Sequence, residues 1–128
     1  MKRKHKGYRQ PITYVLGTLY LDERPNADGS TMGTQITMSY YDEKFHLTKI
    51  NWGTDMGYER SRSGEVESNW QFDEENTQKL MLRLGAHNGH EMLAAIVKRF
   101  KKKGSSATSA IREFCEENEI QYDFYVHY

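Results

Sequence analysis

The chain has 128 residues, a size typical of one domain, and it combines a net charge of zero with 9 Tyr, 5 Phe and 2 Trp. Many aromatic residues without a large net charge argue against a disordered chain, and the single cysteine, Cys115, excludes an internal disulfide and a cysteine-rich zinc site. The sequence contains no run of about 18 apolar residues, so we expect no membrane-spanning helix. The basic N-terminus lacks the apolar segment of a secretory signal, so we expect a cytoplasmic protein.

The zero net charge hides two oppositely charged parts. Residues 1–10 carry a charge of +5, and the other 118 residues hold 13 basic and 18 acidic side chains, a charge of −5. Pro11 favours extended backbone at the junction. We therefore expect residues 1–10 to be a flexible basic arm and residues 11–128 to be a single α+β domain.

The first half of the domain shows strand patterns. Ile12–Leu21 is apolar on both faces, which predicts a central strand or one covered on both sides. Asp22–Gly33 is dense in turn-forming residues and predicts a long hairpin loop. Thr34–Tyr41 alternates apolar and polar residues, as in a half-buried antiparallel strand.

Two further strands follow a tight turn over residues 42–44. Phe45–Trp52 predicts a third strand whose apolar positions change phase between Leu47 and Ile50, which indicates a bulge. Gly53–Gly64 predicts a second long polar loop. Glu65–Phe72 alternates again, so residues 12–72 predict a four-stranded antiparallel meander.

After residue 72 the apolar period becomes helical. Asp73 is a good N-cap for a first helix that Gly85 ends. A second helix is predicted from His90 to Lys103, and a third helix starts after Ser105 or Ser106.

The final segment returns to a strand pattern. Ile120–Tyr128 places Tyr122, Phe124 and Val126 on one side, opposite Tyr125 and His127. The fold class is therefore α+β, with a four-stranded antiparallel meander, three helices and a closing C-terminal strand. Either a monomer or a dimer is compatible with this order, because the closing strand can pair within the chain or with a second copy.

Clusters of cations are the candidate nucleic-acid contacts. They lie in the arm, in the second loop and at the end of the second helix, and they comprise Lys2, Arg3, Lys4, Lys6, Arg9, Arg60, Arg62, Lys98, Arg99, Lys101, Lys102 and Lys103. Aromatic residues of the strands could stack unpaired bases, although a place in the sheet core is the favoured interpretation for Tyr14, Tyr20, Tyr40, Tyr41, Trp52 and Trp70.

The third helix is acidic, which disfavours its use as a DNA-recognition helix. Its carboxylates are candidate contacts for a basic protein partner or form a solvated helix face; they are Glu113, Glu116, Glu117 and Glu119.

Sites for chemistry are weakly marked in this sequence. His87 and His90 straddle a turn instead of following the His-Glu-x-x-His order, and the further ligands would come from His46 or His127. Carboxylates around the second loop, Asp55, Glu65 and Glu67, lack the nearby lysine that a metal-dependent nuclease uses. We assign no catalytic residue, no metal ligand and no cofactor, and we expect Cys115 to be a packed thiol.

These patterns favour a small non-enzymatic binding or regulatory protein that acts through a charged surface, with a protein as the preferred partner. The alternatives are a single-stranded nucleic-acid-binding protein and a metal-dependent hydrolase. In size, two-sided charge and element order the chain resembles small accessory proteins of bacteria and phages, such as immunity proteins or inhibitors of defence systems. That resemblance implies an inhibitor-type role.

Overall fold

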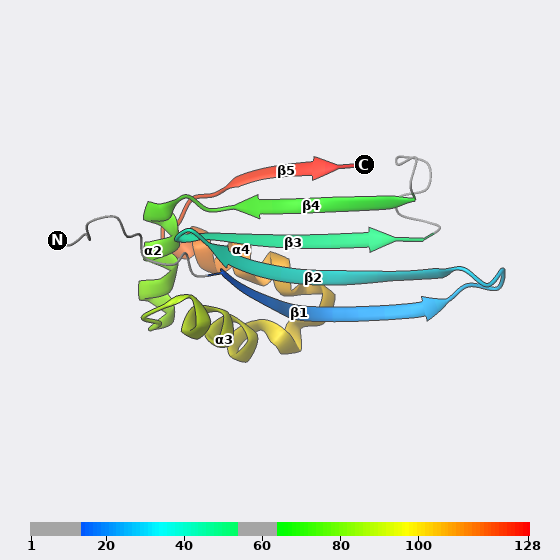
Figure 1. Cartoon of the computed structure of the whole chain (residues 1–128), viewed down its shortest axis with the longest axis horizontal. Helices are drawn as coiled ribbons and strands as arrows, with labels where there is room; N and C mark the ends of the chain where they lie inside the picture. Colours follow the sequence, from blue (N-terminus) through cyan, green and yellow to red (C-terminus); the bar gives the residue numbers. More distant parts are fainter. Residues whose placement is uncertain (1–13, 54–63) are drawn as a thin grey trace, which may run out of the picture.

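A computed structural model describes residues 14–53 and 64–128 of the chain (Figure 1). The strands in these residues form one antiparallel sheet in the order β1-β2-β3-β4-β5. The elements in chain order are β1 (Tyr14–Pro25), β2 (Thr31–Tyr41), β3 (Lys44–Trp52), β4 (Glu65–Gln71), α2 (Glu74–Leu84), α3 (Gly89–Phe100), the 3-10 helix η1 (Lys101–Ser106), α4 (Ala107–Glu117) and β5 (Asp123–His127). This order confirms the α+β class with a meander, helices and a closing strand.

The helices pack on one face of the sheet, and the core lies between the two layers (Figure 1). Alternate residues of the central strands point into this core, because successive side chains of a strand face opposite sides. Ile36, Met38 and Leu47 are almost completely buried there. They meet the apolar stripes of α3 and α4, which include Ile96 and Ile111. Burial of the helical stripes against the sheet is what holds the two layers together.

Both ends of α2 are capped by the residues that the sequence predicted. The Asp73 carboxylate accepts a hydrogen bond from the backbone N–H of Asn76, and Gly85 ends the helix in the left-handed conformation, with φ 72°. Inside α2, the Thr77 hydroxyl accepts a hydrogen bond from the backbone N–H of Phe45 at 3.0 Å. This bond joins the first turn of α2 to the start of β3. The helix is thereby fixed across one end of the sheet (Figure 1).

Three strand predictions were wrong in detail. Asp22–Gly33 is not a long loop, because β1 and β2 continue to Pro25 and Thr31 and pair along their whole length. β1 is an edge strand and not a central one. The apolar residues on the side of β1 that faces away from the helices are exposed to solvent.

The predicted bulge in the third strand is also absent. Its pairings to β2 and β4 run without a register shift. The apolar alternation along β3 is interrupted because a polar residue, Lys49, occupies a position on the helix-facing side. Its side chain donates a hydrogen bond to the backbone carbonyl of Ser105 at 2.9 Å. The irregularity lies instead between Thr18 and Tyr20 of β1.

The second and third helices differ slightly from the prediction. α3 starts at Gly89 after the N-cap Asn88 and ends at Phe100, and residues 101–106 form η1. Gly104 breaks this segment with φ 61° and ψ −133°. Lys101–Lys103 therefore continue directly from α3 as a 3-10 turn, and the backbone breaks only after them. No helix in the described ranges is long and apolar enough to cross a membrane.

Candidate functional site

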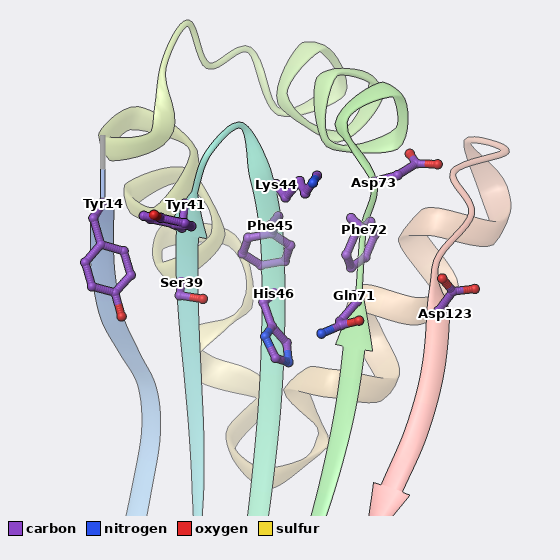
Figure 2. Close-up of a pocket in the computed structure, with 10 residues that line it drawn as sticks. All are labelled: Tyr14, Ser39, Tyr41, Lys44, Phe45, His46, Gln71, Phe72, Asp73 and Asp123. Carbon is purple, nitrogen blue, oxygen red and sulfur yellow. The ribbon is translucent and has the colours of Figure 1, made fainter. Parts of the chain in front are cut away.

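The face of the sheet opposite the helices is the candidate site, and we term it the open face. The strand register places on it every second residue of each strand, opposite to those in the core. In the view of Figure 2 the helices lie behind the sheet, and Tyr14, His46 and Gln71 stand in front of it. The residues of the open face include Tyr14, Leu16, Thr37, Ser39, Tyr41, His46, Thr48, Asn69, Gln71 and Tyr125.

A hollow of about 690 Å³ lies at the end of the open face nearest α2 (Figure 2). A second hollow of about 570 Å³ adjoins it over β1 and β2, and both are lined by Tyr14, Ser39 and His46. We refer to the two together as the open-face groove. Each of the two hollows falls in the range of roughly 300–1,000 Å³ that is typical of ligand pockets.

One end of the groove is aromatic and apolar. Tyr14 and Tyr41 form an edge-to-face pair, with ring centroids 5.4 Å apart. Tyr14 is 60% exposed and Tyr41 is 51% exposed, and the neighbouring Leu16 is 66% exposed. Aromatic and aliphatic side chains in this state keep a large apolar area in water, which a bound partner would cover.

The middle of the open face, beside the groove, is polar. Asn69 is only 1% exposed although it lies on the open face, and its side-chain oxygen accepts hydrogen bonds from His46 Nε2 at 2.9 Å and from the Thr48 hydroxyl at 3.1 Å. The Asn69 Nδ2 atom has no hydrogen-bond partner among the described residues. Beside it, the Gln71 side-chain amide donates to the Tyr125 hydroxyl at 3.1 Å. These bonds join β3, β4 and β5 across the open face.

The far end of the groove carries charge. Asp73 and Asp123 line it together with Phe72, and Lys44, the register partner of Tyr41, lies between the carboxylates and the tyrosines (Figure 2). Hydrogen bonds from the backbone and side chain of Asn76 hold the pKa of Asp73 below its usual value, so this carboxyl is an anion at neutral pH. The groove therefore runs from two tyrosines to two carboxylates.

At the other end of the open face, Trp52 packs on a glycine of the neighbouring strand. Gly33 lies opposite Trp52, and a Cβ atom at Gly33 would come within 2.7 Å of the Trp52 ring. The ring lies over the bare glycine, and its Nε1 donates to the Thr31 hydroxyl at 3.1 Å. Trp52 therefore has its packing within the chain, whereas Tyr14 and Tyr41 stand largely in solvent.

An acidic turn lies at the same end of the molecule as the groove. Asp42 and Glu43 form the β2–β3 turn with positive φ angles of 54° and 64°. The charge of Glu74, together with burial and the hydrogen bond that protonated Glu43 donates to the Glu74 carboxylate, raises the pKa of Glu43. Burial and the charges of Glu43, Glu74 and Asp42 also raise the pKa of Tyr40.

The predicted cations divide between described and undescribed parts of the chain. Lys98 and Arg99 end α3, and all five cations from Lys98 to Lys103 are exposed. The Arg99 guanidinium lies over the Phe114 ring at 4.6 Å. These cations belong to the helix layer, on the opposite side of the sheet from the groove (Figure 1). The other candidates lie outside the described residues: Lys2, Arg3, Lys4, Lys6, Arg9, Arg60 and Arg62.

The predicted acidic contacts belong to the helix layer as well. Glu113, Glu116 and Glu117 are exposed on α4, and Glu119 follows it with a positive φ of 57°. The opposite side of α4 carries Ile111, Phe114 and Cys115 into the core. Burial raises the pKa of Cys115 to about 12, which confirms that it is a packed thiol.

The strand aromatics are split between the two faces. Tyr40 and Trp70 are buried in the core and Tyr20 packs beside it. Only Tyr14 and Tyr41 combine high exposure with a place in the groove.

The histidine and carboxylate candidates do not gather into a site. In residues 14–53 and 64–128 no three His, Cys, Asp or Glu side chains come together in a way that could hold a metal ion. His87 Nδ1 lies 3.1 Å from the carboxylate of Glu91, which also accepts the His87 backbone N–H. Asp55 lies outside the described residues.

Sequence reasoning did not select the groove, although its tyrosines were noted. The pattern that marked it was one apolar side of β1, predicted to consist of Tyr14, Leu16 and Tyr20; the register shift between Thr18 and Tyr20 turns Tyr20 toward the core instead. His46, Asn69 and Gln71 carry no recognisable motif, and only the strand register brings them together.

Comparison with known proteins yields no match to a family model, to a curated protein or to a solved structure.

Proposed function

We propose that this protein is a small non-enzymatic binding protein that holds a segment of a protein partner in the open-face groove. The observation that carries the proposal is the exposure of Tyr14, Leu16 and Tyr41 around a hollow on a sheet face that no described helix covers. Exposed apolar groups gathered beside a concave surface are typical of interaction sites. Such a protein acts by occupying its partner, as inhibitors and accessory proteins do.

The charge of the groove favours a protein segment over nucleic acid. Asp73 and Asp123 lie at one end, Lys44 lies next to Tyr41, and Glu67 stands further along the same face. Carboxylates repel a phosphate backbone, whereas they attract a lysine or an arginine. The cations that would neutralise phosphate, Lys98–Lys103, lie on the helix layer.

These two ends define the chemistry of the partner. An apolar or aromatic anchor of the partner would pack against Tyr14, Leu16 and Tyr41, where it removes apolar surface from water. A basic residue beside the anchor would reach the carboxylates of Asp73 and Asp123. His46 and Gln71 between them offer hydrogen bonds to the partner backbone (Figure 2).

Selection from a displayed library of random peptides tests this proposal. We expect enriched peptides to share an aromatic or large aliphatic residue close to a lysine or arginine. Fluorescence anisotropy with one such peptide should show at least about tenfold weaker binding to Leu16→Ser and to Asp123→Lys.

Leu82→Ser is the matched control for Leu16→Ser. Leu82 is a 78% exposed leucine on α2, in the helix layer. Its substitution should leave peptide affinity unchanged. A library that yields no such motif, or peptides that bind Leu16→Ser as tightly as the unchanged protein, would contradict the proposal.

A single-stranded nucleic acid is the second candidate, because Tyr14 and Tyr41 expose ring faces on which bases can stack. Oligothymidylate is the probe for it. Binding that falls steeply with salt and is lost in Tyr14→Ala would replace the protein-segment proposal with this one.

A further inference from the structure

The outer edge of β5 is a second surface of interest, and its use does not depend on the groove proposal, although Asp123 belongs to both surfaces. β5 is the last strand of the sheet and pairs only with β4 among the described strands. No described strand pairs with the backbone N–H and C=O groups on its other side, so they are available to a further strand. Phe124 on this strand is 53% exposed although its ring lies 5.2 Å from that of Trp70.

The opposite edge of the sheet is protected against such pairing. β1 carries a register shift between Thr18 and Tyr20, and its end contains Glu23, Arg24 and Pro25. A bulge, charged side chains and a proline are the usual devices that prevent edge pairing. β5 has a continuous register and contains neither proline nor lysine or arginine.

The side chains of β5 complement each other when the strand is reversed about Tyr125. In an antiparallel pairing centred there, Asp123 meets the second copy's His127, Phe124 meets Val126, and Tyr125 meets itself. The first pair joins a carboxylate to an imidazole N–H, and the second joins two apolar side chains. Opposite-charge and aromatic–β-branched pairs are the stabilising cross-strand combinations.

We propose that two copies of this chain associate through antiparallel pairing of their β5 strands, with a two-fold axis at Tyr125. Phe124 and Val126 of both copies then pack together on the helix side of the joined sheet. Asp123 and His127 lie on the open side, where His127 also faces Glu67 of its own chain. The two open faces become one continuous surface.

The dimer is expected to be weak. Five-residue strands bury less area than the roughly 1,200 Å² at which specific stable interfaces begin. The association should therefore depend on concentration, and sedimentation velocity over a wide concentration range is the suitable measurement. The expected result is a weight-average mass that rises toward twice that of one chain.

Charge reversal tests the register of the pairing. Asp123→Lys and His127→Asp should each raise the dimer dissociation constant about tenfold or more. Each change removes the complementary pair between positions 123 and 127, and the two-fold axis repeats that loss at both ends of the strand. The double variant carrying both changes should dimerise more tightly than either single variant, because a lysine at position 123 then faces an aspartate at position 127 of the second copy. Glu113→Lys on α4 is the control and should leave the mass distribution unchanged.

A protein that remains monomeric at the highest concentration would overturn the proposal. So would single variants that dimerise as well as the unchanged protein. A double variant that fails to recover dimerisation would overturn the Tyr125-centred register. If Asp123→Lys does not fold, His127→Asp alone gives the same test. Because the readout is mass, Leu16→Ser should dimerise normally even if the groove binds no peptide.

Discussion

The two faces of the sheet are built from the same strands but serve different purposes. On the helix-covered face, Ile36 and Leu47 are completely buried and pack against α3 and α4. On the open face, Leu16 and Tyr41 expose more than half of their surface. Burial accounts for the apolar residues of the first face, since it stabilises the fold. It does not account for those of the second, and this difference is the basis for placing function there.

Truncation of a leucine on each face should give the largest contrast. Leu47→Ala removes a fully buried side chain and should lower the free energy of unfolding by about 2–5 kcal/mol. Leu16→Ala should lower it by less than about 1 kcal/mol, because most of that side chain is already in water. Urea denaturation followed by circular dichroism measures both. Equal losses would mean that the open face is part of the structural core.

The Asn69 hydrogen bonds should contribute an intermediate amount. Asn69→Ala leaves the donors on His46 and Thr48 without their acceptor, and we expect a loss of about 1–3 kcal/mol in the free energy of unfolding. Thr37→Ala, on the neighbouring strand of the open face, is the control and should cost less. A neutral Asn69→Ala would show that the orphaned Nδ2 atom offsets the bonds that the oxygen accepts.

The Asp73 N-cap of α2 should make the free energy of unfolding decrease at acidic pH. The folded-state pKa of Asp73 is lowered, so its contribution is present above the ordinary carboxyl value of 3.8 and is lost as pH falls through the lower folded value. Asp73→Asn retains a good cap but cannot titrate. Melting curves between about pH 2 and 7 should therefore show a weaker acid dependence for this variant than for the unchanged protein.

The acidic turn should have the smallest effect on stability, and the pH dependence of that effect should be opposite in sign to that of Asp73. The folded-state pKa of Glu43 is raised, chiefly by the charge of Glu74, so the favourable contribution is present below 4.5 and is lost as pH rises through the higher folded value. Glu43→Gln should then raise the melting temperature slightly at pH 7 and have no effect below 4.5. A lower melting temperature at pH 7 would contradict the repulsion between Glu43 and Glu74.

Much of the fold could be predicted because local patterns specify it. Alternation marked β2 and β4, and capping residues marked both ends of α2, where Asp73 and Gly85 have their predicted roles. The β1–β2 hairpin was misjudged because Asp22–Pro25 and Thr31–Gly33 are rich in turn formers. Pairing along eleven register positions outweighs those local preferences.

The candidate site could be predicted only in part. The second apolar side of β1 was visible, but it was interpreted as burial, because sequence does not show which faces of a sheet are covered. The groove depends on residues from β1 to β5 and from the N-cap of α2. Strand order and register bring them together, and neither can be read from spacing along the chain.

Mapping by NMR tests most directly whether the open face is the binding surface. In a titration of the labelled protein with a peptide from the displayed library, we expect the largest amide shift changes at Leu16, Ser39, His46 and Gln71, the residues around the open-face groove. Changes confined to the helix layer, around Lys98–Lys103 or Glu113–Glu117, would contradict the account.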